Sequence, residues 1–158
     1  MKHTILPLSQ HYLLSALRLR DTLFPRLGKA EYATLEASIL NQNAIKKSLG
    51  IDELYYWIAL KDEAVAGLVG LYTQSDDSGG QVWLGWYGVD VHCRGLGLGS
   101  ALLDFAIKEA SAFGFDILKL YTTNADEYAT ARALYTHKGF VDVTPSKKAK
   151  KRYYSLAL

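Results

Sequence analysis

Three glycines at alternate positions, Gly95 to Gly99, constrain this chain more than any other feature. They follow Trp83–Val91, which is typical of an extended β segment, and an amphipathic helix begins directly afterwards, at Leu98 or Gly99. Because glycine has no Cβ, a ligand can approach the peptide groups closely. The first turn of the helix also carries unpaired N–H donors and the positive end of the helix dipole. The segment therefore predicts a phosphate or pyrophosphate site with Arg94 at its edge.

Three kinds of phosphate loop compete for this segment. A P-loop requires Gly-x-x-x-x-Gly-Lys-Ser/Thr, and no lysine lies between Arg94 and Lys108. A dinucleotide fingerprint requires a later third glycine and an acid at the end of the next strand, which Ile117–Thr123 lacks. The third pattern, Arg/Gln-x-x-Gly-x-Gly/Ala, fits Arg94–Gly99 at every fixed position. With this pattern the chain resembles the GNAT superfamily of N-acetyltransferases, in which the turn holds the pyrophosphate of acyl-coenzyme A.

A second match downstream strengthens the resemblance. Ala131–Phe140 has the form Ala-x-x-x-Tyr-x-x-x-Gly-Phe, with its tyrosine at Tyr135. An expected helix over 101–113 and the strand 117–123 separate the two motifs, as in the family, and the resemblance covers roughly residues 83–143. The family often has Asn seven residues before the tyrosine, whereas this chain has Tyr128 there and Asn124 nearer the strand end.

The resemblance implies an α+β fold, with a mixed, mostly antiparallel central sheet, helices on both faces and one parallel strand pair that splays apart. We expect a single domain over residues 1–158. The pantetheine arm of acetyl-CoA would lie between the splayed strands, and its pyrophosphate on the glycine turn. The coenzyme-binding residues that this arrangement implies are Val89, Val91, Arg94, Gly95, Leu96, Gly97, Leu98, Gly99, Ser100 and Asn124.

Composition is that of one soluble globular domain. The chain has 158 residues, 49% of them apolar, and a formal net charge of +2, which indicates neither disorder nor a nucleic-acid footprint. No apolar run reaches the roughly 20 residues of a membrane span, and the N-terminus lacks a long apolar signal core. The one cysteine, Cys93, excludes an internal disulfide and fits the reducing cytoplasm. We therefore expect no membrane, nucleic acid or metal among its partners.

Hydrophobic periodicity predicts the remaining elements. Ser9 is expected to cap the first helix, Pro25 to break it and Gly50 to end the second. The expected elements, in chain order, are strand 4–8, helix 10–27, helix 30–47, strands 54–60 and 64–73 joined by residues 61–63, a hairpin turn at 75–80 and, after the motifs above, strand 152–158.

Acetyl transfer to an amine needs a polarised carbonyl, a proton for the leaving thiolate and a route for the proton of the amine. A backbone N–H near Val89 would serve as a one-donor oxyanion site. Tyr135 is the expected proton donor, since the family places this hydroxyl near the coenzyme sulfur and a phenol of pKa about 10 can protonate a thiolate. Packing of its helix onto the sheet is the other role open to Tyr135.

The general base stays unassigned. Many relatives use a Glu on the strand before the glycine turn, but residues 83–89 include no acid. Asp90, Asp126 and Glu127 are the nearest carboxylates in sequence. Asp90 can also simply end the strand, and Asn124-Ala-Asp-Glu127 also has the form of a capping box with Asn124 as N-cap. A chain of water molecules leading to bulk solvent is an equal alternative.

Two features bear on the acceptor. The basic run Lys147–Arg152 is either a solvated loop or a lip that attracts an anionic acceptor or the 3′-phosphate of the coenzyme. Eleven tyrosines exceed what packing requires in a chain of this size, although aromatics at alternate strand positions are usually core. Some could line a cleft for an amine, by cation–π contact or hydroxyl hydrogen bonds; the candidates are Tyr55, Tyr56, Trp57, Tyr72, Trp83, Trp86, Tyr87 and Tyr121.

The function expected from these residues is acyl-CoA-dependent N-acetyl transfer. Acetyl-CoA would donate its acetyl group to a primary amine of a small molecule or protein, by direct transfer in a ternary complex. The alternative is a GNAT module that holds acyl-CoA as a sensor or partner subunit without turnover, which the missing strand Glu favours and Tyr135 disfavours. Cys93 has no His or acid motif to activate it and is expected to be passive. The one oligomeric state considered for this chain is a homodimer.

Overall fold

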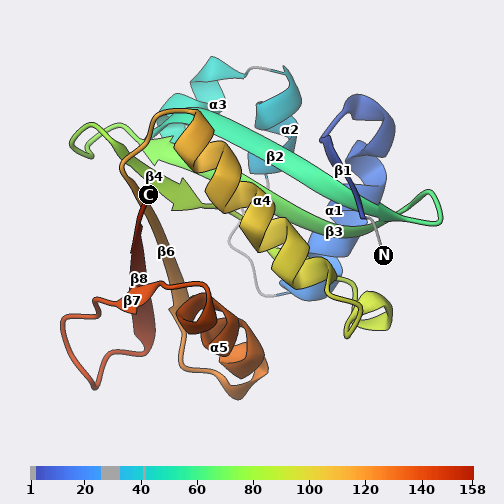
Figure 1. The fold of residues 1–158 in the computed structure, drawn as a ribbon. Coiled ribbons are helices and arrows are strands. Elements are labelled where there is room, and N and C mark those ends of the chain that lie inside the picture. Colours follow the sequence, from blue (N-terminus) through green and yellow to red (C-terminus); the bar gives the residue numbers. More distant parts are fainter. Residues whose placement is uncertain (1–2, 26–32, 41) are drawn as a thin grey trace.

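One sheet organises the described residues, and helices cover both of its faces (Figure 1). The computed structural model describes residues 3–25, 33–40 and 42–158. Strand order within these residues is β1-β2-β3-β4-β6-β8-β7, with β5 also paired to β3. The strands are β1 (Thr4–Pro7), β2 (Ile51–Lys61), β3 (Ala64–Gln74), β4 (Gln81–Leu84), β5 (Gly88–Val89), β6 (Ile117–Thr123), β7 (Val141–Asp142) and β8 (Lys151–Ala157).

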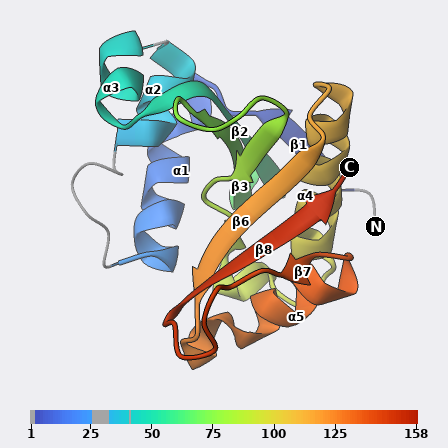
Figure 2. The ribbon, with the colours of Figure 1, turned by 90° about the vertical axis from the view of Figure 1, so that its left-hand side faces the viewer.

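All strand pairs are antiparallel except β4 with β6, so the predicted α+β class with one parallel pair is confirmed. Helices α1 (Gln10–Leu23), α2 (Thr34–Leu40) and α3 (Asn43–Ser48) pack on β2 and β3. Helices α4 (Leu98–Ala112) and α5 (Ala129–His137) lie on the opposite face (Figure 2). Strand alternation supplies both cores: Leu71 and Leu118 belong to the buried cluster under α4, and Ile58 and Leu68 to the cluster under α1 to α3.

The N-terminal helices differ from the prediction in three ways. Helix α1 ends at Leu23, because the residue before Pro25 disfavours the helical region and Phe24 has φ −132°. Ser9 occupies the N-cap position, but its side chain makes no capping hydrogen bond. The helix expected over 30–47 is divided into α2 and α3, with Gln42 at φ −75° and ψ 82°, outside the helical region. Residues 26–32 and 41, on which parts of these predictions fall, lie outside the described residues.

The segment 83–91, expected as one strand, is interrupted by a β-bulge. Leu71 of β3 pairs with Leu84, and Leu68 pairs with Gly88. Three steps along β3 (71 to 68) therefore oppose four steps along the partner segment (84 to 88), which leaves one extra residue in the stretch 85–87. A bulge of this kind bends the strand and re-aims its side chains.

Tyr56 of β2 fills the space under this bulge. Its hydroxyl accepts a hydrogen bond from the Trp86 N–H at 3.4 Å. A Cβ on Gly85 would lie 2.9 Å from that hydroxyl, and a Cβ on Gly70 would lie 2.3 Å from the ring. Both glycines thus make room for one buried phenol, and they explain why the strand is broken here.

Beyond the bulge, the two parallel strands separate. Their pairing runs from Gln81 with Ile117 to Trp83 with Lys119. Farther along, β5 pairs with β3, and residues 120–123 of β6 pair with β8. We call the unpaired interval between β5 and residues 120–123 the strand gap. The predicted splayed parallel pair is therefore present, and Figure 1 shows β6 and β8 diverging from the rest of the sheet.

Candidate active site

The glycine turn leads from the strand gap into α4. After β5 the chain forms a short 3-10 helix, η2 (Val91–Cys93). Val91, predicted to be the last residue of the strand, therefore belongs to this helix, and its side chain is exposed. Gly95 and Gly97 have φ of 77° and 78°, in the left-handed region that glycine adopts without strain. A Cβ at Gly97 would meet no atom within 4 Å. Conformation, rather than crowding within the chain, therefore requires glycine at this position.

Backbone donors gather at the start of α4. Gly97 is the N-cap residue, and the first bond that closes the helix runs from the Ala101 N–H to the Gly97 carbonyl at 3.0 Å. The four N–H groups before Ala101, those of residues 97–100, have no intrahelical acceptor. Together with the helix dipole they can bind the oxygens of a pyrophosphate. The predicted residues Gly97, Leu98, Gly99 and Ser100 are thus brought together by main-chain geometry.

Tyr87 connects the glycine turn with the bulge. This contact was not predicted from the sequence. Its hydroxyl donates to the Gly99 carbonyl at 2.6 Å. A Cβ on Gly99 would lie 3.3 Å from that hydroxyl and 3.6 Å from Val89 Cγ2, so glycine allows close packing of the helix on β5. Burial, with a smaller effect of Tyr135 and Asp104, raises the pKa of the Tyr87 phenol. The hydroxyl therefore remains a hydrogen-bond donor at all physiological pH values.

The backbone of Val89 faces the strand gap. The Asp90 N–H donates to the Ala66 carbonyl at 2.8 Å, while Val89 is opposite Gly67 in the same ladder. Because bonded and non-bonded pairs alternate in an antiparallel ladder, the N–H and C=O of Val89 point away from β3. The Val89 carbonyl instead accepts from Arg94 Nε at 3.2 Å. Its N–H is directed into the gap, where the prediction required an oxyanion donor.

Tyr135 of α5 is buried on the same face as α4. Its ring lies 6.1 Å from the Tyr87 ring and 5.8 Å from the rings of Phe140 and Tyr154, measured between centroids. Burial is the main cause that raises the pKa of its phenol, and the nearby Tyr154 and Tyr128 add to the shift. The tyrosine is therefore a packing residue with a protonated phenol, and its ring neighbours that of Tyr87.

Of the three candidate carboxylates, that of Asp90 is engaged in local structure, and those of Asp126 and Glu127 belong to exposed residues of a 3-10 helix. Asp90 is the N-cap of η2, and its side chain accepts from the His92 N–H at 2.8 Å. Glu127 lies in the 3-10 helix η3 (Asp126–Tyr128), whose N-cap is Ala125, so the capping box predicted with Asn124 as N-cap is wrong. Among the described residues, no hydrogen bond joins the Asp90 or Glu127 carboxylate to the backbone of Val89. Neither carboxylate is therefore identified as a general base.

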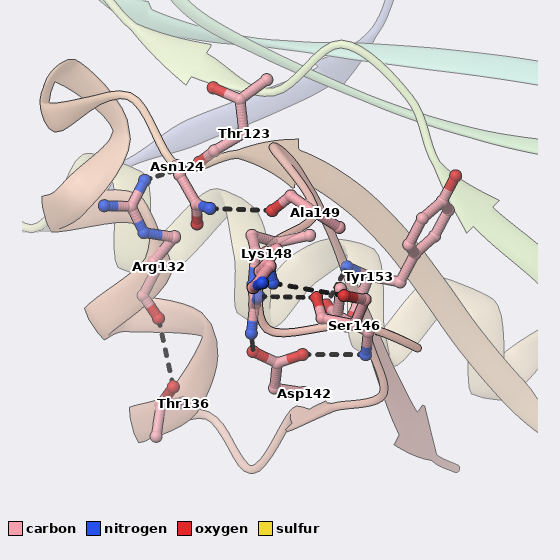
Figure 3. A network of polar contacts seen from close by, with 11 residues as sticks. Thr123, Asn124, Arg132, Thr136, Asp142, Ser146, Lys148, Ala149 and Tyr153 are labelled. Carbon is pink, nitrogen blue, oxygen red and sulfur yellow. Dashed lines mark hydrogen bonds and ion pairs between the residues drawn. The ribbon is translucent and has the colours of Figure 1, made fainter.

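Asn124 holds the loop between β7 and β8 instead. Its side-chain amide donates to the Ala149 carbonyl at 2.9 Å (Figure 3). Its backbone N–H donates to the Lys150 carbonyl at 2.9 Å. Arg132 fixes the same corner by donating to the Thr123 and Ala125 carbonyls at 2.6 and 2.9 Å. The amide of Asn124 is thus used within the fold, and a coenzyme contact of this residue stays a prediction.

The aromatic candidates divide into two groups. Tyr56 and Trp57 are buried in the cores, and burial raises the pKa of Tyr56 to about 12. Tyr55 packs against Phe113 at the far end of α4, with ring centroids 5.0 Å apart. Tyr121, by contrast, is 43% exposed on the sheet face opposite α4. This division follows strand alternation, which places Tyr121 and the buried Leu120 on opposite faces of β6.

Two findings concern other partners. Among the described residues, no group of three His, Cys, Asp or Glu side chains is placed to hold a metal ion. No helix in the same part of the chain is long and apolar enough to cross a membrane.

Comparison with known proteins identifies the family. The sequence profile of the acetyltransferase (GNAT) family matches residues 16–140. The chain belongs to this family. Family membership makes acetyl-CoA its cosubstrate and agrees with the backbone donors gathered on the glycine turn. It also agrees with the two motifs around Arg94 and Tyr135 that carried the resemblance.

Two solved structures share this fold over their whole length, and one relative found by sequence is a longer protein. The chain is 37% identical over 93 residues to a mycothiol acetyltransferase of Beutenbergia cavernae, a match that covers 58% of this chain and 30% of that protein. An acetyltransferase of the GNAT family from Staphylococcus aureus Mu50 superposes with a TM-score of 0.76 at 19% identity, over 99% of both chains. The PaiA N-acetyltransferase of Thermoplasma acidophilum, solved in complex with coenzyme A, superposes with a TM-score of 0.73 at 14% identity, over all of both chains.

Proposed function

We propose that this chain transfers the acetyl group of acetyl-CoA to a primary amine of a small molecule or protein, directly and in a ternary complex. The strand gap is the observation that carries the proposal. It opens at the glycine turn, and the Val89 N–H is directed into it. A pantetheine arm laid along the gap would bring the thioester carbonyl to that N–H, which would stabilise the oxyanion of the tetrahedral intermediate.

Tyr135 is proposed as the proton donor to the leaving sulfur. Its raised pKa keeps the phenol protonated at neutral pH, as a donor must be. The same shift makes full transfer to a thiolate, whose conjugate acid has a pKa of about 8.5, unfavourable on its own. We therefore assign Tyr135 a relay role: it donates to sulfur as the C–S bond breaks and regains a proton released from the amine nitrogen.

The amine's proton leaves without a dedicated carboxylate in this proposal. Asp90 is held by the His92 N–H and Glu127 belongs to η3. A chain of water molecules from the amine to solvent, or to the Tyr135 hydroxyl, completes the transfer. This assignment predicts a rate that rises with pH until the acceptor amine itself is deprotonated.

Thermal unfolding tests the coenzyme part of the proposal. Acetyl-CoA should raise the melting temperature, because it binds the native state selectively. Pantetheine, which lacks the pyrophosphate, should raise it far less at equal concentration. Equal shifts from the two compounds would contradict binding of the pyrophosphate at the glycine turn.

A binding module without turnover is the second candidate, and the engagement of Asp90 in a cap favours it. Slow release of free thiol from acetyl-CoA, with and without a panel of primary amines, separates the two. Stimulation of thiol release by an amine supports the enzyme, whereas binding with no release supports the module. Light scattering at two protein concentrations tests the predicted homodimer.

A further inference from the structure

Four aromatic rings form a row across the sheet on the face opposite α4 and α5, with Tyr72 packed against the core under α1 to α3 and Tyr121 exposed. They come from β3, β4, β6 and β8, and successive ring centroids are 6.4, 6.4 and 6.3 Å apart. Strand register produces the row, since its members stand at neighbouring positions of adjacent strands. We call this set the aromatic row: Tyr72, Trp83, Tyr121 and Tyr153.

Two lysines lie against the aromatic row. Lys119 Nζ is 5.4 Å from the ring centre of Trp83. Lys151 Nζ is 3.9 Å from the ring centre of Tyr121 and 5.8 Å from that of Tyr153. Neither lysine has a carboxylate within ion-pair distance among the described residues.

The charge of this surface is therefore positive on balance. A cation held over a ring keeps its N–H donors available on the side away from the ring. The loop behind Lys151 adds Lys147, Lys148 and Lys150. One acidic residue contacts the aromatic row: the Asp77 carboxylate accepts a hydrogen bond from the Trp83 indole N–H at 2.6 Å.

The aromatic row also reaches the strand gap. Tyr121 lies two residues beyond Lys119, the last residue of β6 that pairs with β4. The glycine turn and Tyr135 lie on the α4 side of the sheet, whereas the row lies on the other side. In this interval no backbone ladder lies between the two sides of the sheet. A molecule on the row could thus present a nitrogen to a carbonyl held in the gap.

We infer that the aromatic row, with Lys119 and Lys151, binds the acceptor, and that this acceptor is a small primary amine whose flat ring carries an anionic group. The ring of the amine packs against Tyr121 and Trp83 beside the ammonium groups that already lie over them, and the two ammonium groups recognise a carboxylate or phosphonate by charge-assisted hydrogen bonds. The inference rests on the proposed acetyl transfer, of which it names the substrate class.

Three matched amines test the inference. The full ligand is para-(aminomethyl)benzoate. Its carboxamide removes the charge, and the cyclohexane analogue removes the flat ring while keeping the charge and length. We expect kcat/KM to be highest for the benzoate and about tenfold lower for each of the other two, since one charge-assisted contact or one ring stack is lost. Equal kcat/KM for the three amines overturns the inference and leaves acetyl transfer standing.

Variants locate the contact. Lys151→Met should raise KM for the benzoate about tenfold and leave KM for the carboxamide and the affinity for acetyl-CoA unchanged. Lys108→Met, an exposed lysine of α4 on the opposite side, is the matched control and should change neither. An equal change for benzoate and carboxamide in Lys151→Met would overturn the assignment of the anion to this lysine.

A binding measurement keeps the inference testable if no amine is acetylated. Titration of the protein with para-(aminomethyl)benzoate should quench tryptophan fluorescence, and Trp83→Phe should abolish most of the signal. Saturable quenching without acetyl transfer would reject the proposed function and keep the ligand site. Acetyl transfer to simple alkyl amines with no quenching by the benzoate would keep the function and reject the site.

Discussion

The two sides of the strand gap differ in the groups that they offer to a ligand. On the α4 side, the site consists of main-chain groups: four N–H donors at the start of the helix and the N–H of Val89, with glycine allowing the approach. On the opposite side, the surface consists of side chains, the aromatic row and its two lysines. A main-chain site recognises what every acyl-CoA shares, and a side-chain surface can vary with the acceptor. Substitutions should therefore separate coenzyme effects from acceptor effects.

Tyr135→Phe should have the largest effect on the rate, and this effect should not depend on which coenzyme or acceptor contacts are made. Loss of the hydroxyl should lower kcat by roughly 10²–10⁴-fold, the usual contribution of positioned proton transfer, with acetyl-CoA affinity held within a few-fold. Because burial raises the pKa of this phenol, parent kcat should show no loss from tyrosine ionisation between pH 8 and pH 10. Steady-state rates against pH check both statements.

The matched control for that variant is Tyr154→Phe, which removes the hydroxyl of a buried neighbour whose ring centroid is 5.8 Å from that of Tyr135. It should leave kcat within threefold of the parent. A kcat of Tyr135→Phe within threefold of the parent would reduce Tyr135 to packing.

Gly97→Val should break the coenzyme side alone. A side chain at φ 78° is strained by about 1–3 kcal/mol, and relief of that strain would move the N–H donors off the pyrophosphate. Affinity for acetyl-CoA, measured by calorimetry, should fall by on the order of 100-fold, a loss of about 2.7 kcal/mol. Binding of para-(aminomethyl)benzoate to the aromatic row should be unchanged.

The control for Gly97→Val is Gly114→Val, at the other end of α4. Gly114 has φ 87°, and a Cβ added there would meet no atom within 4 Å, as at Gly97. Its substitution should cost similar stability without loss of coenzyme affinity. Parent-like acetyl-CoA binding by a folded Gly97→Val protein would place the pyrophosphate elsewhere.

Tyr87→Phe should sharpen the comparison by loosening the turn without altering its backbone. Loss of one hydrogen bond to the Gly99 carbonyl should weaken acetyl-CoA binding about fivefold, or about 1 kcal/mol. Pantetheine should bind as before, since it does not reach the turn. Tyr55→Phe, whose hydroxyl contacts exposed Glu53, serves as control. Equal weakening for both ligands would show that Tyr87 supports the gap rather than the turn.

Asp142→Asn should give the smallest effect, confined to the loop that adjoins the aromatic row. Hydrogen bonds from Thr144, and then from Arg152, lower the pKa of the Asp142 carboxyl to about 2. A lowered pKa stabilises the fold above the unfolded pKa, near pH 4, and this contribution disappears as the pH falls through about 2. The variant should melt about 1 °C below the parent at pH 7, since the pair is exposed. The difference should shrink between pH 4 and pH 2, and a difference independent of pH would contradict this account.

The sequence predicted the main-chain side of the site better than the side-chain side. Glycine spacing determines where a strand becomes a helix, so the turn at Gly95–Gly99 and the strand 117–123 were found with their bounds. The bulge was missed because it depends on Tyr56, thirty residues before Trp86, which only the folded register brings beneath it. The capping box at Asn124 was wrong because the backbone N–H of Asn124 still pairs with the Lys150 carbonyl, so the 3-10 helix begins one residue later, with Ala125 as its N-cap.

The acceptor surface lay beyond sequence reasoning for a related cause. Tyr72, Trp83 and Tyr121 were recognised as aromatic candidates, but nothing local distinguishes them from core residues such as Trp57. Their alignment follows from the pairing of β4 with β6 and of β6 with β8, strands that other elements separate in sequence. The basic run 147–152 was recognised as a possible site for an anionic acceptor, and one of its members, Lys151, is the lysine that lies over Tyr121.

The strand gap also has a consequence for the dynamics of the protein. An unfilled interval in a sheet leaves backbone amides without a ladder on one side, so the two strand edges that border it should open locally at low free energy. Hydrogen exchange at Val89, and at those amides of residues 120–123 that point away from β8, should then be fast in the free protein. A pantetheine arm has amides of its own and would occupy the gap as a missing strand does. Coenzyme binding should slow exchange there first, well before it slows exchange in the already protected β2–β3 hairpin.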